Sequence, residues 1–558
     1  ALDKCKSNYT ISRIKADVII LGCSLPGIVA AHKLKKKFGN TMDIVVLDLA
    51  DTIGTVAQQR ASKGNVVFQH LGGEDDEDEE EAEEEKEDET ENNEIDLVDN
   101  VARYFLEKYA KEFHIPVPVE IMSPITIKSP LAKLFQNLNG DTQQFMNDFH
   151  DFDYLSFIEK FELNQYQMLL DLNMKGLFQM NLEGKNSKAD RNRLLYYDQT
   201  TMEEHICGAL LFRSSREIMR TTVRLVCGSA PKTVSVLFYL HQCFRTSGVR
   251  NHLGGDNTRF REKLLGFCRK RLAHKLQQSV ADITLRAKTI NRIRASCADE
   301  KVILETMKGE ITYVCNLLAM ALKPDELIGI RFDEELFSRE QIAITKGMKP
   351  GRARKFVIQY EENVWSQQGF SGDILSIRGP IVWAMEKPKL STTGSVDRYF
   401  TLIGYLKVID DGVQDSKEAV IEQLVKLFGQ EAAYPATYKE TVVADVYVPR
   451  CGDYVALRCL KHESPKYLEW SALDVFADGD LVAAIEAGHS AYIHLLSCLR
   501  PQAQTFEDMV ASQWPTVLND NILRGCLAHV NFVSGIKSTI YFAAAIVTVK
   551  FLINYFKK

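Results

Sequence analysis

The stretch that decides the fold is residues 16–48, which read ADVIILGCSLPGIVAAHKLKKKFGNTMDIVVLD. Its first apolar run, 18–21, has the pattern of a strand that is buried on both faces. A glycine turn at 22–27 follows, and the next residues place apolar side chains and lysines at helical spacing. A second apolar run, 44–47, predicts another buried strand and ends on Asp48. The stretch therefore predicts a strand, a turn, a helix and a second strand followed by an acid.

This order is typical of the unit that binds dinucleotides in Rossmann-like folds. Gly22 and Gly27 lie at the first and third glycine positions, and Asp48 lies where an acid holds ribose hydroxyls. The middle glycine, which lets backbone N–H groups close on a phosphate, is Ser24 here. A Cβ atom at this position stands where the phosphate would come closest. We therefore predict an intact scaffold in which Gly22, Ser24, Gly27 and Asp48 make weak or vestigial cofactor contacts.

The negative charge of the chain is concentrated in one segment. The 558 residues carry 68 basic and 75 acidic side chains, a net charge of -7, but residues 74–96 alone contain 17 acids and one lysine. The rest of the chain therefore has a net charge of about +9, which is -7 plus 16. A run so poor in apolar residues cannot form a core, so we predict a disordered insertion. A docking site for a basic protein partner or for calcium is the alternative interpretation of this loop.

The cysteines and the N-terminal residues indicate in which cellular compartment the protein is expected. The 12 cysteines include no CxxC pair, so we predict no metal site, and their even number permits disulfides without assigning them. The sequence begins with Ala1, which would fit removal of a signal peptide, although trimming would give the same start. The sequon Asn8-Tyr9-Thr10 predicts glycosylation of Asn8. We therefore expect a luminal or extracellular body in the secretory pathway or at the cell surface.

The rest of the chain predicts a helical excursion followed by a return to strands. A helix is expected at 97–113, and residues 129–225 have several helical patterns. A basic amphipathic helix at 258–280 has no aromatic platform interleaved with its basic residues, so we predict a solvated face and no nucleic-acid partner. The strands expected afterwards lie at 283–293, 302–307, 311–318, 356–360, 373–376, 442–448, 454–457 and 473–479, and a helix follows at 481–496.

The C-terminal segment predicts a membrane anchor. Residues 538–556 read STIYFAAAIVTVKFLINYF, and 19 residues of this kind are just long enough to span a bilayer. Lys550 lies inside the run, while Tyr541 and Tyr555 suit the two interfaces. We therefore expect a single-pass helix, with a buried C-terminal helix as the alternative interpretation. A tail anchor in the mitochondrial outer membrane is the alternative location.

The order of these parts resembles the flavin-containing amine oxidase superfamily, and within it the monoamine oxidases. Besides 16–48, the resemblance is carried by FYLHQC at 238–243, Gly254-Gly255, TINRI at 289–293, GRARKF at 351–356, Tyr360, Trp365, GFSGDILS at 369–376 and IEAG at 485–488. It implies a fold with an FAD-binding domain and a substrate domain. It also implies that Lys355 lies where these oxidases keep a lysine that assists flavin oxidation, that Ile290 lies against the adenine, and that Gly479 lies at a turn near the flavin.

Several residues differ from the pattern of that family at the cofactor. Ser24 replaces the second glycine, and the segment after Asp48 lacks the arginines and the paired glycines that wrap the flavin phosphates. The turn after the last core strand is shortened, and Asp480 stands where the family has a tyrosine of its aromatic cage. No segment for covalent flavin attachment is present. A bidentate arginine and a backbone cradle each contribute substantially to phosphate binding, so we predict weak or absent FAD.

We therefore predict an α/β protein in which a Rossmann-like, FAD-binding-type domain is interleaved with a substrate-type domain, followed by a transmembrane helix. The expected parts are an N-terminal segment 1–15, dinucleotide-type domain 16–73, acidic insertion 74–96, mostly helical substrate-type region 97–282, dinucleotide-type domain 283–320, substrate-type domain 321–440, closing strands and helix of the dinucleotide-type domain 441–500, linker 501–537 and transmembrane helix 538–556. The predicted function is that of a membrane-anchored, amine-oxidase-like protein with an eroded FAD site, a pseudoenzyme that is non-catalytic or weakly active and acts through binding. The alternative is an active FAD-dependent amine oxidase that produces peroxide, with Lys355 as its catalytic residue.

Overall fold

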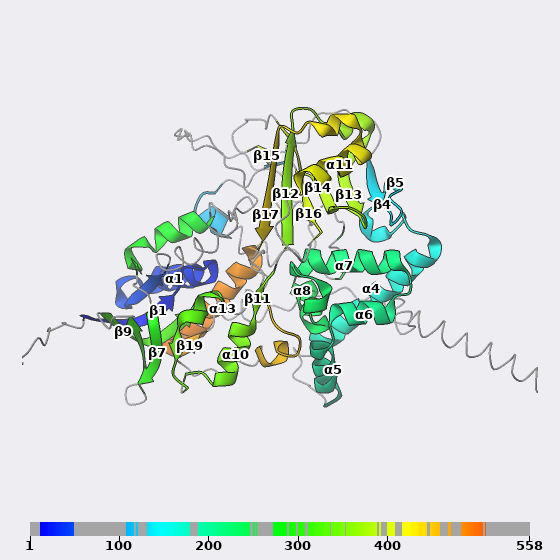
Figure 1. Ribbon diagram of the computed structural model, residues 1–558. Coiled ribbons are helices and arrows are strands. Elements are labelled where there is room, and N and C mark those ends of the chain that lie inside the picture. Colours follow the sequence, from blue (N-terminus) through cyan, green and yellow to red (C-terminus); the bar gives the residue numbers. More distant parts are fainter. Residues whose placement is uncertain are drawn as a thin grey trace, which may run out of the picture. The chain divides into compact units, whose positions relative to one another are not determined.

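The chain forms two compact units built from interleaved segments (Figure 1). Unit 1 comprises described residues within 1–118, 261–342 and 461–519, and unit 2 comprises those within 119–260 and 343–460. The computed structural model describes residues 12–49, 108–115, 119–120, 131–178, 188–245, 249–250, 253, 272–286, 290–296, 300–306, 311–334, 336–351, 353–387, 390–391, 399–407, 416–443, 447–457, 467–469, 481–505 and 508.

Unit 1 is built on an eight-stranded sheet in the order β10-β7-β8-β9-β1-β2-β6, with β19 also paired to β9. Its strands are β1 (Ser12–Leu21), β2 (Ile44–Asp48), β6 (Thr284–Arg286), β7 (Ile290–Ser296), β8 (Lys301–Thr306), β9 (Ile311–Met320), β10 (Arg331–Phe332) and β19 (Leu468–Glu469). Strand β1 lies between β2 and β9 and is parallel to both. The apolar run 18–21 is completely buried, as its uninterrupted hydrophobicity predicts for a central parallel strand.

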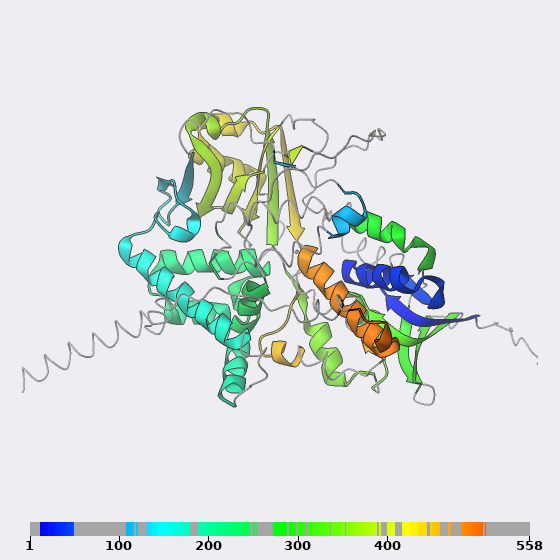
Figure 2. The same cartoon turned by 180° about the vertical axis from the view of Figure 1, so that it is seen from behind.

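Two helices pack on this sheet side by side, as Figures 1 and 2 show: α1 (Leu25–Phe38) against β1 and β2, and α13 (Leu481–Leu499) against β9 and β19. Helix α1 begins after Ser24 and ends at Gly39, whose φ of 52° lies in the region that favours glycine. Its last turn carries three lysines, which suit the negative end of the helix dipole. A Cβ on Gly488 of α13 would lie 2.6 Å from Cβ of Val29, so glycine is what allows these helices to pack so closely.

The sheet of unit 2 has seven strands in the order β17-β12-β16-β14-β13-β4-β5. They are β4 (Ala132–Gln136), β5 (Thr142–Phe145), β12 (Ala353–Tyr360), β13 (Phe370–Ser376), β14 (Ile381–Glu386), β16 (Phe400–Leu406) and β17 (Thr437–Val443). Helix α11 (Lys417–Phe428) packs against this sheet, and Leu424 and Phe428 share a buried cluster with Phe356 and Trp365. The sheet is mainly antiparallel, with β4 and β13 paired in parallel.

The remaining elements of unit 2 are mostly helices. They are α4 (Phe157–Phe178), α5 (Lys188–Gln199), α6 (Met202–Ala209), α7 (Arg213–Cys227) and α8 (Val236–Arg245), with the short strands β3 (Val119–Glu120), β11 (Lys349–Pro350), β15 (Leu390–Ser391) and β18 (Tyr447–Val448). Helix α8 packs against α4, α5 and α7. Helix α10 (Arg339–Gly347) contains the boundary between the two units.

The strand, turn, helix and strand predicted for 16–48 are all present, as β1, α1 and β2. The region expected to be mostly helical contains helices α4 to α8 and, in addition, the strand pair β4 and β5. One local expectation is wrong. Residues 454–457 are helical rather than a strand, because Tyr454 and Val455 donate their backbone N–H groups to the buried carboxylate of Asp198, which caps a helix start.

The division between the units also differs from the expected one. Residues 441–443 were expected to close the dinucleotide-type domain, but they continue β17 and pair with β12 in unit 2. Residues 272–279, expected in the substrate-type region, form a helix of unit 1. Leu272 and Leu276 of this helix belong to the same buried cluster as the apolar residues of α1. The helix is therefore part of the core of unit 1.

Several expectations fall on residues outside those that the structure describes. They include the acidic insertion 74–96, glycosylation at Asn8, the strand 473–479 with the turn at Gly479, most of the basic helix 258–280 and the span 538–556. Among the described residues, no helix combines the length and the apolar character needed to cross a bilayer.

Candidate functional site

The first glycine of the turn in unit 1 is required by the neighbouring strand. Gly22 has a φ of 104°, and its N–H donates to the carbonyl of Leu47 at 2.9 Å, which ties the turn to the end of β2. A Cβ at Gly22 would lie 2.4 Å from the carbonyl oxygen of Ala321, just after β9. Both the conformation and the close approach therefore call for glycine at this position, whatever the turn binds.

The third glycine is required by the contact between α1 and the sheet. A Cβ at Gly27 would lie 2.4 Å from Cβ of Ala321 and 3.2 Å from Cγ2 of Ile20. Gly27 thus sets the distance between the helix and β1. The two glycines that identify the dinucleotide-type turn are accounted for by packing within unit 1.

Ser24 occupies the middle position at the N-terminus of α1. Its carbonyl accepts the N–H of Ile28 at 3.0 Å, but its side chain makes no capping hydrogen bond. The hydroxyl oxygen is buried and has no hydrogen-bond partner among the described residues. Pro26 in the first turn removes one N–H from the positive end of the helix. The helix start therefore offers fewer donors to an anion than a turn with three glycines.

Asp48, the candidate ribose acid, lies close enough to Cys23 in the turn for its charge to act on the thiol. Burial and, after it, the charges of Asp48 and Glu326 together raise the pKa of Cys23 to about 12. The thiol is therefore protonated at neutral pH and can only donate. Two carboxylates thus lie near one sulfur at the place where a pyrophosphate would bind.

Ile290, the candidate adenine contact, is buried at the start of β7. In the sheet, β8 and β9 lie between β7 and β1, while the strand beside β2 is β6. The strand expected at 283–293 is thus two strands with different neighbours. Arg286 of β6 lies opposite Asp48 in the parallel register, although the sequence did not single it out.

Lys355, the candidate catalytic residue, belongs to unit 2. It lies on β12, opposite Tyr405 of β16 and Thr441 of β17. Its ammonium nitrogen lies 5.2 Å from the centre of the Tyr405 ring, within the range of a cation–π contact. The side chain is half-buried. The neighbouring Arg354 is buried and binds the carboxylate of Glu440 and the hydroxyl of Ser416.

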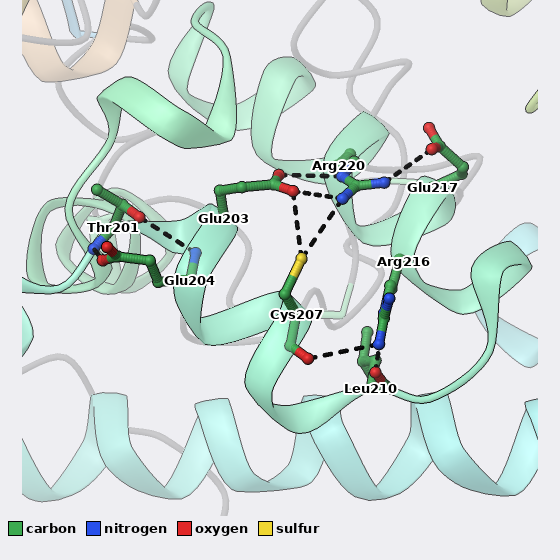
Figure 3. A network of polar contacts seen from close by, with 8 residues as sticks. All are labelled: Thr201, Glu203, Glu204, Cys207, Leu210, Arg216, Glu217 and Arg220. Carbon is green, nitrogen blue, oxygen red and sulfur yellow. Dashed lines mark hydrogen bonds and ion pairs between the residues drawn. The ribbon is translucent and has the colours of Figure 1, made fainter.

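A polar network outside the predicted site joins α6 and α7 (Figure 3). Arg220 of α7 pairs with Glu203 and with Glu217, and the Cys207 thiol donates to Glu203 at 3.3 Å. The Arg220 guanidinium holds the pKa of Glu203 below its ordinary value. Arg216 donates to the carbonyl oxygens of Leu210 and Cys207 at the end of α6. Because its charges are paired with one another, this network fixes the two helices rather than forming an open site.

The sequence alone predicted the turn and Asp48, but it did not predict that Cys23 and Glu326 belong to the same site. Asp48 and Glu326 lie on different segments, and only the fold brings both near the Cys23 thiol. A cysteine beside the first glycine is a signal that could have drawn attention to the thiol. Within the described part of the chain, no group of three or more His, Cys, Asp or Glu side chains could hold a metal ion.

Comparison with known proteins agrees with the resemblance. No family model matches the chain. A probable flavin-containing monoamine oxidase A of Dictyostelium discoideum is 22% identical over 257 residues, which span 44% of this chain and 53% of that protein. The chain thus matches about half the length of this curated relative.

Solved structures match over most of the chain. Wild-type putrescine oxidase bound to putrescine has a TM-score of 0.61 at 12% identity, covering 87% of this chain and all of that one. Cyclohexylamine oxidase from Brevibacterium oxydans has a TM-score of 0.58 at 16% identity, covering 86% and 98%. The chain therefore has the same mixed α/β fold as putrescine oxidase and cyclohexylamine oxidase, the fold that its resemblance to the amine oxidases predicts.

Proposed function

We propose that this protein is an amine-oxidase-like pseudoenzyme in which the FAD site is eroded, so that it acts through binding rather than through turnover. The observation that carries the proposal is that Gly22 and Gly27 are both required by close packing against Ala321, so the dinucleotide-type turn does not need a cofactor to be retained. At the same turn, Ser24 adds a Cβ where the backbone of a three-glycine turn would approach a phosphate.

The charge around the turn supports the same proposal. FAD brings a pyrophosphate with two negative charges, and like charges within a few ångströms of it disfavour binding. Asp48 and Glu326 both act on the sulfur of Cys23, so two carboxylates border the turn. The start of α1 and the unpartnered Ser24 hydroxyl would favour an anion. We infer that these features do not fit a tightly held FAD.

The rival proposal is an active FAD-dependent amine oxidase. Its support is the fold, shared with putrescine oxidase and cyclohexylamine oxidase, together with a lysine at 355 on β12. Bound FAD would accept a hydride from an amine and pass the electrons to oxygen to give peroxide. An ammonium group can stabilise negative charge that develops on a reduced ring. In this proposal Lys355 is the residue that supplies that charge.

The location and the partners are part of the proposal. A transmembrane helix at 538–556 would anchor the protein, and glycosylation at Asn8 would accompany a luminal or extracellular body. The acidic residues 74–96 would be the contact surface for a basic protein partner. The rival location is the mitochondrial outer membrane, with a tail anchor. A mass loss at Asn8 on enzymatic deglycosylation of protein from secretory cells would favour the first location, and an unmodified Asn8 the second.

The experiment that separates the two functions is the flavin content of the purified full chain after gel filtration. The pseudoenzyme proposal predicts no flavin absorbance in the protein fraction and no peroxide release from amines. The oxidase proposal predicts bound flavin and peroxide release that is lost in Lys355→Met. Flavin without peroxide release would reject erosion of the site but not the lack of turnover.

A further inference from the structure

A cysteine, a histidine and a glutamate of unit 1 meet at the end of α13, outside the candidate site. Cys498 lies in the last turn of the helix, one turn after His494. The sulfur of Cys498 is 3.7 Å from Nε2 of His494, within hydrogen-bonding range for a thiol. Nδ1 of the same ring forms an ion-pair contact with the carboxylate of Glu469 on β19. The imidazole therefore lies between the thiol and the carboxylate.

The exposure of the three side chains suits a nucleophile that reacts with molecules from solvent. Glu469 is 2% exposed, the side chain of His494 is 41% exposed, and Cys498 is exposed. The buried carboxylate can orient the ring and stabilise its protonated form, while Nε2 is left to take the proton of the thiol. These are the roles of a nucleophile, a base and a group that orients the base.

The place of Cys498 on the helix makes its ionisation depend on His494. A thiolate in the last turn of a helix lies at the negative end of the helix dipole, which disfavours it. A protonated imidazole beside the sulfur has the opposite effect, because it pairs with the thiolate.

The other charged groups that the described structure brings to α13 are engaged elsewhere. Lys33 and Lys37 of α1 lie over the ring of Tyr492, which is on a different face of α13 from His494. Lys37 also pairs with Asp508 at 2.7 Å. Arg500, just after the helix, donates to the carbonyl of Thr41 at 2.9 Å. Strand β9, which also packs against α13, carries no charged side chain.

We propose that Cys498 is a modification site for small disulfides, with His494 as the base that activates its thiol and Glu469 as the residue that positions the base. An exposed sulfur can meet such a molecule without a binding cleft, and thiol–disulfide exchange requires only a thiolate and a disulfide. The proposal goes beyond the proposed function and is independent of whether the protein binds FAD.

The exchange converts Cys498 and a disulfide RSSR into a mixed disulfide and a thiol RSH. The thiol of Cys498 gives its proton to Nε2 of His494, and the thiolate attacks one sulfur of RSSR. A sulfur–sulfur bond to Cys498 forms as the original one breaks, and the leaving thiolate takes the proton from the imidazolium. The sulfur of Cys498 is oxidised and the leaving sulfur is reduced, so an excess of RSH reverses the reaction.

The test is the reaction of the reduced full chain with oxidised glutathione at pH 7 and at about pH 9.5, followed by peptide mass mapping of each cysteine. Cys207 is the internal control, because it is also exposed but its thiol donates to Glu203 at 3.3 Å. Burial and the Glu203 carboxylate raise the pKa of Cys207. At pH 7, Cys498 should react about threefold or more faster than Cys207, since each tenfold gain in thiolate fraction raises the exchange rate about threefold.

His494→Gln should slow the reaction of Cys498 about threefold or more at pH 7. At about pH 9.5 the variant should be no slower than the natural chain, because the thiol is then largely ionised in both and the less acidic thiol is the better nucleophile. Glu469→Gln should change the rates in the same direction by a smaller factor. The matched control is His274→Gln, at an exposed histidine of the helix 272–279, which should change neither rate.

Thermal unfolding of each variant shows whether the fold is kept, and His494→Gln carries the test if Glu469→Gln does not fold. Equal rates for Cys498 and Cys207 at pH 7 would overturn the proposal. So would a Cys498 rate at pH 7 that His494→Gln leaves unchanged, or a decrease by the same factor at both pH values, which would indicate a structural effect. A folded Glu469→Gln with natural rates would reject the positioning role of Glu469.

Discussion

Gly27 of α1 lies against Ala321, which follows β9, so closely that a Cβ on Gly27 would stand 2.4 Å from Cβ of Ala321. These residues are nearly 300 positions apart in the sequence. Their contact sets how near the first helix lies to the central strands of unit 1. Gly27, which belongs to the glycine pattern of a cofactor-binding turn, is therefore also required by packing. Such a glycine would be retained even in a protein that does not bind the cofactor.

Gly27→Ala should destabilise the protein by about 1–3 kcal/mol, the usual effect of overpacking a buried contact. Adding Ala321→Gly to Gly27→Ala should restore part of the loss, because it removes the opposing methyl group. The matched control is Gly208→Ala in α6, where a Cβ meets nothing within 4 Å. Alanine there should be neutral or stabilising. Equal melting temperatures for Gly27→Ala and Gly208→Ala would show that the helix can shift freely.

His489 should make the protein sensitive to acid. Its pKa is lowered to about 3, chiefly by burial and also by the charges of Lys33 and Lys108, which Asp508 opposes. The folded state therefore prefers the neutral ring, whereas the unfolded state takes up a proton below about pH 6.5. This contribution to stability is complete above pH 6.5 and falls steadily as the pH drops from 6.5 towards 3.

His489→Gln should flatten that part of the pH dependence, because glutamine does not titrate and can still accept a hydrogen bond from Tyr109, which lies 3.0 Å from the ring nitrogen. Tyr109→Phe should lower stability at every pH while keeping the slope. Urea unfolding between pH 4 and pH 7 measures both. If His489→Gln leaves the slope of the unfolding free energy against pH unchanged, the acid sensitivity comes from other groups.

Two neighbouring cations on β12 should differ sharply in their effect on stability. Arg354 is 8% exposed and paired with Glu440, so Arg354→Met leaves the partly buried Glu440 carboxylate with the Tyr438 hydroxyl as a donor but without its cation, and should destabilise by about 1–3 kcal/mol. Lys355→Met loses a half-buried cation–π contact with Tyr405, and about 1 kcal/mol or less is expected. Urea unfolding of the two variants gives the comparison, and a larger loss for Lys355→Met would contradict it.

Alkylation of Cys23 tests its contact with Asp48 without any ligand. The thiolate is the reactive form, and the carboxylate of Asp48 helps to keep the pKa of Cys23 at about 12. Asp48→Asn should therefore speed reaction of Cys23 with iodoacetamide, followed by peptide mass mapping. Cys315, buried in β9, is the internal control and should react at the same slow rate in both proteins. An unchanged Cys23 rate would mean that the carboxylate does not act on the thiol.

The first strand, helix and second strand of unit 1 could be predicted because their signals are local. An apolar run, a glycine turn and helical spacing all lie within 33 residues. Strand β5 could not be predicted, because three of its four residues are exposed and only Phe145 is buried. The helical turn at 454–457 was read as a strand because its cap, the carboxylate of Asp198, lies more than 250 residues away.

The sequence predicted which residues form the candidate site, but it did not predict which of them lie close together in the fold. The sequence shows that Ser24 replaces a glycine and that Asp48 ends a strand. It does not show that the Cys23 thiol reaches Asp48 or that Glu326 lies near the same sulfur. Those contacts form because β1 pairs with both β2 and β9, which brings the segments after these strands close to the turn. The local sequence does not show this pairing.

The central claim is that the fold of a flavin amine oxidase is retained here without its cofactor. The most direct test is release and quantification of flavin from the full chain, expressed with added riboflavin and passed through gel filtration. The account predicts protein without a flavin spectrum and no FAD in the supernatant after heat denaturation. Equimolar FAD that stays with the protein through the column would contradict it.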